Sequence, residues 1–125
     1  MNPKDLKYTE THEWAHVEDG IVTIGITAHA IEQLSDLVFL NLPDVGEPVT
    51  AGESFGEIES VKAVSDLKSP CTGAVVEVND ALEDDLSLVG ADPYGDGWMI
   101  RVRSSDALDA LMSASEYART ITEGA

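Results

Sequence analysis

The stretch FGEIESVKAVSDLKSP, residues 55–70, decides the fold. Strand-forming residues lead into Ser60-Val61-Lys62-Ala63, and a second extended run follows. Small and polar residues at such a crossing favour a tight turn between two strands. The sequence therefore predicts a β-hairpin with Lys62 near its tip, where another enzyme can reach the amine. An ordinary solvated turn lysine is the alternative interpretation.

The residues before this hairpin predict a second hairpin and a short helix. Asp19 and Gly20 stand between two extended segments, a pair typical of a tight turn, so residues 11–17 form the first strand. Thr27 then precedes a run with Ile31 and Leu34 at helical spacing. This pattern predicts a helix that Thr27 caps at its N-terminus.

Short strands and turns dominate the middle of the chain. LVFLNLP, residues 37–43, predicts a buried strand ended by Pro43. Glycine and proline then recur at intervals typical of a small sandwich or barrel, at Gly46, Pro48, Gly52, Gly56, Pro70 and Gly73.

The last quarter of the chain predicts one strand and two helical pieces. WMIRVR, residues 98–103, alternates as a half-exposed strand does, with Trp98, Ile100 and Val102 on one face and Met99, Arg101 and Arg103 on the other. The apolar side of the first helical piece consists of Leu108, Leu111 and Met112, and Ser113 to Glu116 form a capping box that opens the second. The prediction is a mainly β domain (α+β by content), residues 1–125, with an inserted helix and a helical segment over about residues 105–122.

Composition narrows the classes of protein. A single cysteine, Cys71, allows no internal disulfide and favours a reducing compartment, and we expect it to be a small apolar residue beside a turn. No apolar run approaches the roughly 18 residues of a membrane span. The first ten residues lack the features of a signal or transit peptide. We therefore expect a cytoplasmic protein from a prokaryote, with no membrane partner.

The charge distribution leaves only two lysines in a long acidic stretch of the chain. A net charge of −17 argues against nucleic-acid binding, because phosphate would be repelled, and acid excess also favours a soluble monomer. Between Tyr8 and Ile100 the only basic residues are Lys62 and Lys68. Any partner that recognises Lys62 does so against an acidic field.

HEWAH, residues 12–16, matches the zinc-protease pattern H-E-x-x-H. On the predicted strand, His12 and His16 share a face but lie about 13 Å apart at about 3.3 Å per residue. One zinc ion cannot bridge them, because zinc–nitrogen bonds are about 2.0–2.1 Å long. His29 is the only other histidine. We therefore interpret the two histidines of HEWAH as surface or half-buried strand residues and keep a metallohydrolase only as a minor alternative.

Several dispersed motifs, in order, resemble those of one family, the H proteins of the glycine cleavage system. The resemblance runs from about Tyr8 to Tyr117. It rests on HEW at 12–14, VTIGIT at 22–27, LVFLNLP at 37–43, ESVKAVSD at 59–66, SP at 69–70 and DPYGDGWMI at 92–100.

The resemblance implies a barrel-sandwich hybrid fold and a non-catalytic carrier with lipoic acid amide-linked to Lys62, on a lipoyl hairpin around residues 55–70. It also implies partners. A pyridoxal-phosphate-dependent glycine decarboxylase loads the arm with an aminomethyl group, and a tetrahydrofolate-dependent aminomethyltransferase unloads it. An FAD-dependent dihydrolipoamide dehydrogenase then reoxidises the dithiol, and lipoylating enzymes attach the cofactor.

Four further residues take roles by resemblance. Glu13 would meet the amine of the loaded arm, with polar contacts from Asp66 and from Thr11, which stands where relatives often have serine. Glu59 would help the lipoylating enzymes to recognise the acceptor. Solvated surface acids are the alternative interpretation of Glu13 and Asp66.

Two other functions stay open. An H-like protein that relays lipoyl groups to other lipoate-dependent complexes would also need a modified Lys62. A Schiff-base enzyme would need Lys62 activated by burial or a neighbouring cation, and an acidic turn offers neither. Biotin attachment is disfavoured, because Val61 and Ala63 occupy the positions where biotin carriers have methionine.

Overall fold

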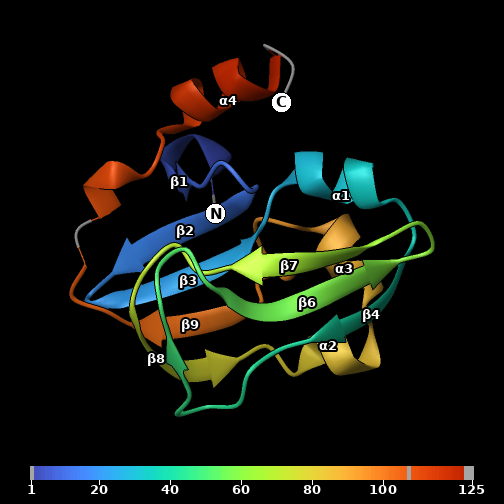
Figure 1. The fold of residues 1–125 in the computed structure, drawn as a ribbon, viewed down its shortest axis with the longest axis horizontal. Helices are drawn as coiled ribbons and strands as arrows, with labels where there is room; N and C mark the ends of the chain where they lie inside the picture. Colours follow the sequence, from blue (N-terminus) through green and yellow to red (C-terminus); the bar gives the residue numbers. More distant parts are fainter. Residues whose placement is uncertain (1, 107, 123–125) are drawn as a thin grey trace.

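Two antiparallel sheets make up the fold in a computed structural model that describes residues 2–106 and 108–122 (Figure 1). The first sheet has the strand order β1 (Lys7–Tyr8), β2 (Glu13–Glu18), β3 (Ile21–Ile26), β9 (Ile100–Arg103), β8 (Gly73–Val78) and β5 (Pro48–Val49). The second has the order β4 (Leu37–Asn41), β6 (Ser54–Ser60) and β7 (Val64–Lys68).

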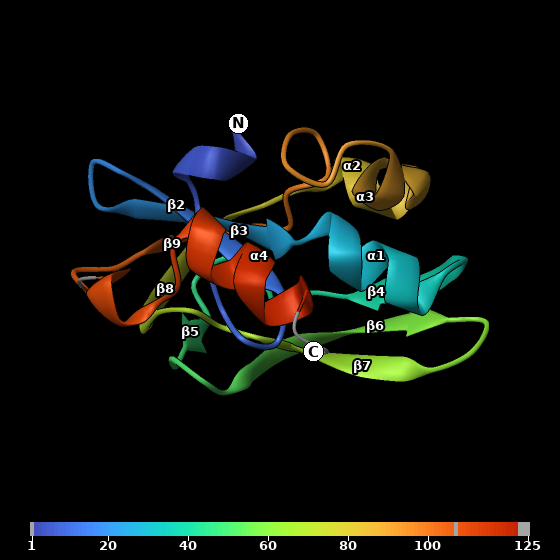
Figure 2. The same cartoon turned by 90° about the horizontal axis from the view of Figure 1, so that it is seen from above.

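Short helices cover the sheets. They are η1 (Pro3–Asp5), α1 (Ala28–Leu34), α2 (Ala81–Asp84), α3 (Ser87–Ala91), η2 (Leu108–Ala110) and α4 (Ala114–Thr122). Figure 2 shows α1, α2 and α3 grouped at one end of the molecule, whereas α4 packs against η1 and β1. The sequence pattern predicted neither α2 nor α3, because each is too short to show a helical period.

The main core lies between the two sheets. Its fully buried side chains come from both layers, among them Val22, Ile24, Val75 and Val102 of the first sheet and Ile58 and Leu67 of the second. A smaller cluster joins α4 to the β1 edge of the first sheet and consists of Leu6, Tyr8, Trp14 and Tyr117. The C-terminal helix is therefore held by a core of its own.

The structure confirms the predicted Asp-Gly hairpin. Glu18 pairs with Ile21, and the two turn residues have φ angles of 52° at Asp19 and 78° at Gly20. A two-residue hairpin turn with both φ angles positive matches the right-handed twist of its strands. The strand before it begins at Glu13, two residues later than predicted, because residues 9–12 form a turn.

Both predicted helix caps are confirmed. The Thr27 side chain accepts a hydrogen bond from the Ala30 amide at 3.2 Å. The Ser113 hydroxyl accepts from the Glu116 amide, and the Glu116 carboxylate accepts from the Ser113 amide at 3.0 Å. In the predicted segment of about 105–122 the helical pieces are η2 and α4, and residue 107 lies outside the described residues.

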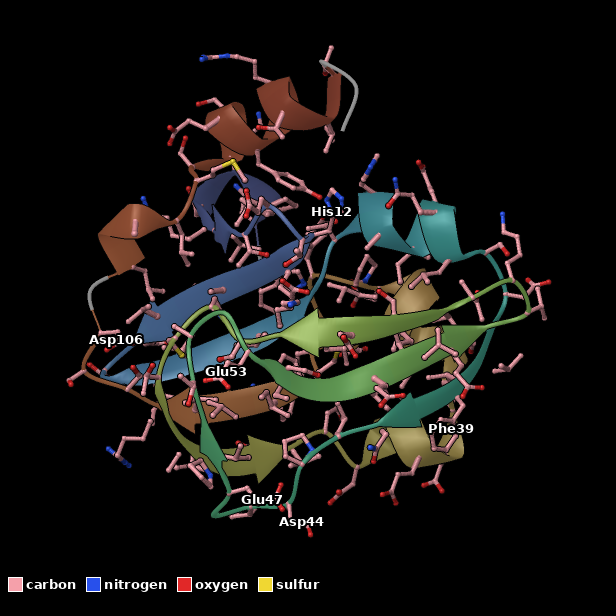
Figure 3. The ribbon with its side chains drawn as sticks, viewed as in Figure 1. His12, Phe39, Asp44, Glu47, Glu53 and Asp106 are labelled. Carbon is pink, nitrogen blue, oxygen red and sulfur yellow. The ribbon has the colours of Figure 1, made fainter. Side chains whose placement is uncertain are left out.

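Two burial predictions were wrong. The strand in residues 37–43 is not buried, because Val38 and Phe39 on β4 are 54% and 52% exposed. β4 is an edge strand whose pairing with β6 shifts register between Leu37 and Phe39, so neighbouring side chains are both exposed, and Figure 3 shows Phe39 on it. Met99, placed on the exposed face of a strand, is 0% exposed, because β9 begins only at Ile100 and the alternation does not extend to Met99.

Candidate functional site

Lys62 lies in the predicted position, at the tip of the β6–β7 hairpin. The last strand pair is Glu59 with Val64, and Ser60 closes the turn. The Ser60 hydroxyl accepts hydrogen bonds from the amides of Lys62 and Ala63 at 3.2 and 3.1 Å, and the Ser60 amide donates to the Ala63 carbonyl at 2.8 Å. One serine thus fixes the backbone on both sides of the lysine.

A second contact anchors the tip to the rest of the chain. The Val61 amide donates to the carbonyl of Asp36, in the turn between α1 and β4, at 3.0 Å. The Lys62 side chain is exposed, as are its neighbours Val61 and Ala63. The hairpin therefore holds its backbone in place while it leaves the amine open to a large partner.

Glu13, at the start of β2, is a buried carboxylate surrounded by neutral donors. It is 1% exposed. The hydroxyls of Thr9 and Thr11 each donate to its Oε1 at 2.5 Å, and the backbone amide of Lys68 donates to its Oε2 at 3.2 Å. These contacts tie the beginning of β2 to the end of β7.

No positive group accompanies this carboxylate within the described ranges. The one ion pair found there joins Arg101 to Glu77 at 2.8 Å. Burial raises the pKa of Glu13, although the hydrogen bonds from Thr11, Thr9 and Lys68 act in the opposite direction. A buried carboxylate without a counter-ion is costly, so a cation that reaches this point is stabilised.

A cavity of about 680 Å³ opens beside the residues that donate to Glu13, which itself is buried behind them and does not line it. Its wall includes Thr9, Thr11 and Lys68, the three residues that donate to the carboxylate. Other lining residues come from the C-terminal part of the chain, including Met112 and Thr120. A second cavity of about 260 Å³, between residues 40–45 and α2, contains none of the predicted site residues.

The other predicted site residues lie along the hairpin. Asp66 is exposed on β7 opposite Glu57, and Glu59 is half-buried on β6 between Val64 and Phe39. No hydrogen bond within residues 2–106 and 108–122 joins Asp66 to Thr11, Glu13 or Lys62. Lys62 and Lys68 are six residues apart, at most about 20 Å along an extended strand. Asp66 therefore lies between the lysine tip and the Glu13 cavity.

Comparison with known proteins identifies the family. A sequence model of the glycine cleavage H-protein matches residues 6–124. The chain is 58% identical over 121 residues to the glycine cleavage system H protein of Rubrobacter xylanophilus, covering 97% of this chain and 95% of that one. It is 54% identical over 117 residues to the protein of that name from Myxococcus xanthus, covering 92% and 91%. The chain belongs to the glycine cleavage H-protein family.

A solved H-protein structure agrees with the fold. The crystal structure of a glycine cleavage system H protein from Mycobacterium marinum matches with a TM-score of 0.91 at 49% identity, covering 97% of this chain and 99% of that one. The barrel-sandwich hybrid fold expected from the sequence is thereby confirmed, as a pair of sheets with short helices.

Sequence reasoning about this H-protein chain missed part of the Glu13 site. Thr9 and the Lys68 amide were not predicted, since the turn at residues 9–12 brings Thr9 next to Glu13 only when His12 adopts a φ of 75°. A positive φ at a residue other than glycine has no reliable sequence signal. The cluster TETHE, residues 9–13, was the available hint, because it gathers two hydroxyls and two carboxylates within five residues.

HEWAH does not form a metal site of the protease kind. His16 lies within β2 as predicted, but the prediction of a strand at His12 was wrong, because His12 lies in the turn before β2; neither histidine is on a helix. The described residues contain no group of three or more metal-ligating side chains that could hold an ion. Across residues 2–106 and 108–122, no helix has the length and apolar character needed to span a membrane.

Proposed function

We propose that the protein is a non-catalytic lipoyl carrier of glycine cleavage, with the lipoyl group amide-linked to Lys62. The observation that carries the proposal is the exposed hairpin tip at Lys62, in a chain of the H-protein family with a counter-ion-free carboxylate at the base of the same hairpin. When attached, the lipoyl dithiolane supplies the sulfur that accepts the aminomethyl group of glycine and later gives it up.

The residues of the chain divide the remaining work. The Ser60 turn presents Lys62 to partner active sites, and a tether of this kind makes delivery effectively intramolecular, at effective concentrations of about millimolar. Thr11 receives the cationic end of the arm in the cavity, away from bulk water, and Glu13 behind it supplies the negative charge. Asp66 offers a carboxylate between the two positions, and Glu59 marks the acceptor lysine for the lipoylating enzymes.

The proposed partners are those of the glycine cleavage system. They are the pyridoxal-phosphate-dependent glycine decarboxylase, the tetrahydrofolate-dependent aminomethyltransferase and the FAD-dependent dihydrolipoamide dehydrogenase. We place the protein in the bacterial cytoplasm as a monomeric, single-domain carrier that itself catalyses none of these steps. The lipoyl-relay function uses the same lysine and differs only in the partner that takes the arm.

Peptide mapping of the protein from its own cells tests the proposal. Acylated lysine resists trypsin, and Lys62 is the only basic residue between Lys7 and Lys68. We expect a single peptide from Tyr8 to Lys68, heavier by one lipoyl group. Cleavage at a free Lys62 in cells that lipoylate other proteins would refute the carrier function. Transfer of label from glycine by the decarboxylase separates glycine cleavage from lipoyl relay.

A further inference from the structure

Three side chains from distant parts of the chain meet behind the Glu13 turn. The Tyr117 hydroxyl, on α4, lies 2.7 Å from His12 Nδ1 and 2.7 Å from Thr27 Oγ1. The Thr27 amide also donates to the His12 carbonyl at 3.0 Å. His12 is thus held through its ring and its backbone, in the place that Figure 3 shows between α4 and α1. His29 packs against the same ring, with centroids 4.7 Å apart.

The hydrogen bonds form a chain with one consistent direction. Thr27 Oγ1 already accepts from the Ala30 amide, so its proton is free to be donated to the Tyr117 oxygen. Tyr117 can then donate its own proton to Nδ1 of a neutral His12. This order satisfies each hydroxyl, and a buried hydroxyl left without a partner would cost stability.

His12 needs this support because its backbone is unusual. Its φ of 75° is uncommon for any residue other than glycine, and such conformations persist only where the surroundings enforce them. The residues on either side of His12 are Thr11, which lines the cavity, and Glu13, whose carboxylate accepts a hydrogen bond from Thr11. A change at His12 therefore moves both of them.

The helix that supplies Tyr117 also contributes Thr120 to the lining of the cavity, next to Met112 just before the helix. Met112 exchanges two backbone hydrogen bonds with Tyr8, both 2.9 Å, and Thr120 of α4 donates to the Met112 sulfur at 3.5 Å. Met112 and Thr120 both line the cavity. The C-terminal helix thus contacts the cavity directly through its wall and indirectly through the His12 turn.

We infer that Tyr117 and His12 are positioning residues, through which the C-terminal helix α4 orients Glu13 and Thr11 for the cationic end of the arm. The inference rests on the proposed carrier function, because it gives α4 a part in protecting the loaded arm. Tyr117 does not line the cavity, and its hydroxyl contacts His12 and Thr27. Beside a direct electrostatic interaction with Glu13, its effect passes through the geometry of residues 11–13.

Amide hydrogen exchange of the full, unmodified chain tests the inference. The Lys68 amide donates to Glu13 Oε2, so its exchange rate reports whether the carboxylate is in place. In Tyr117→Phe we expect this rate to rise about tenfold, which corresponds to about 1.4 kcal/mol of local opening. Core amides such as that of Val102 report global unfolding for comparison.

Tyr8→Phe is the matched control. The Tyr8 ring stacks on that of Tyr117, with centroids 4.6 Å apart, but its hydroxyl donates to the Pro3 carbonyl and not to the His12 turn. We expect its loss to leave Lys68 exchange unchanged after correction for global stability. An equal rise in both variants, or none in Tyr117→Phe, would overturn the inference.

His12→Gly separates the side chain from the backbone. Glycine adopts positive φ readily, so the turn stays allowed while the hydrogen bond to Tyr117 is lost, and Lys68 exchange should rise as in Tyr117→Phe. Unchanged exchange would overturn the role of the His12 ring. With the lipoylated protein, the aminomethyl-loaded arm should hydrolyse faster in both variants. A protein that carries no lipoyl group would instead fail at the mapping step, while the exchange result would still stand.

Discussion

Replacing Glu13 by glutamine removes the buried negative charge behind the cavity wall while it keeps the shape of the side chain and an oxygen acceptor. In the structure this carboxylate is 1% exposed, accepts three hydrogen bonds and has no cation beside it. An ammonium at about 4 Å would gain about 4 kcal/mol at an effective dielectric constant of 20. Loss of water from the ammonium offsets part of this gain.

The net gain in free energy from the contact between the ammonium and Glu13 is that of a hydrogen bond to a charged group, about 1.5–3 kcal/mol. We therefore expect Glu13→Gln to lower the ratio of closed to open arm by about ten- to hundredfold. The assay loads the lipoylated protein with labelled glycine through the decarboxylase, removes the decarboxylase and follows the release of ammonia. Release should be faster by up to the same factor.

A matched control tests whether the faster release of ammonia is specific to Glu13. Glu18, at the other end of the same strand, is exposed, so Glu18→Gln changes the net charge equally without touching the cavity. Release of ammonia from this control should match the wild type. If Glu13→Gln protects the loaded arm as well as the wild type does, the carboxylate is not the counter-ion and the reasoning is wrong.

Three further outcomes are expected. Ser60→Ala removes the acceptor of two turn amides, so it should raise the exchange rate of the Lys62 amide about two- to tenfold, for a loss of about 0.5–1.5 kcal/mol. It should also slow lipoylation in an assay with purified lipoylating enzyme. Lipoylation at the normal rate would show that the lipoylating enzyme does not recognise the turn geometry. Burial and His29 lower the pKa of His12 below its ordinary 6.5, so the folded chain binds fewer protons than the unfolded chain below that pH. The stability that His12 contributes is therefore present above pH 6.5 and is lost as pH falls through the folded pKa. Urea unfolding of wild type and His12→Asn between pH 8 and pH 5 should show a steeper loss of stability for the wild type, and parallel curves would contradict this. Gly73→Ala places a Cβ 2.1 Å from the Arg103 carbonyl oxygen and should lower the free energy of unfolding in urea by about 1–3 kcal/mol or more. Gly90→Ala, whose Cβ would have its nearest atom at 3.5 Å, should not lower it. Equal losses of stability in the two variants would refute the packing argument.

The hairpins and caps could be predicted because their signals are local. Asp19 and Gly20 need only each other to specify a turn, and Ser113 and Glu116 satisfy each other across three residues. The exposure of Phe39 could not be predicted this way, because it depends on β4 being an edge strand. Sheet order is set by contacts distant in the sequence.

In the candidate site, too, local features could be predicted and long-range contacts could not. Lys62 follows from the small residues around it, and its role follows from the resemblance. The burial of Glu13 depends on an amide fifty-five residues away, and the support of His12 depends on Tyr117, one hundred and five residues away. A pattern of neighbouring residues does not contain such pairs.

The contact between Glu13 and the Lys68 amide also bears on self-association. β7 is the outer strand of the three-stranded sheet, and its amides alternate in direction. The Ser69 amide donates to the Glu53 carbonyl across the hairpin. The Lys68 amide therefore points away from β6, to the outer edge of the sheet, where it donates to the Glu13 carboxylate. An open edge invites a strand from another molecule. The carboxylate therefore blocks the point at which a second copy could begin to extend the sheet.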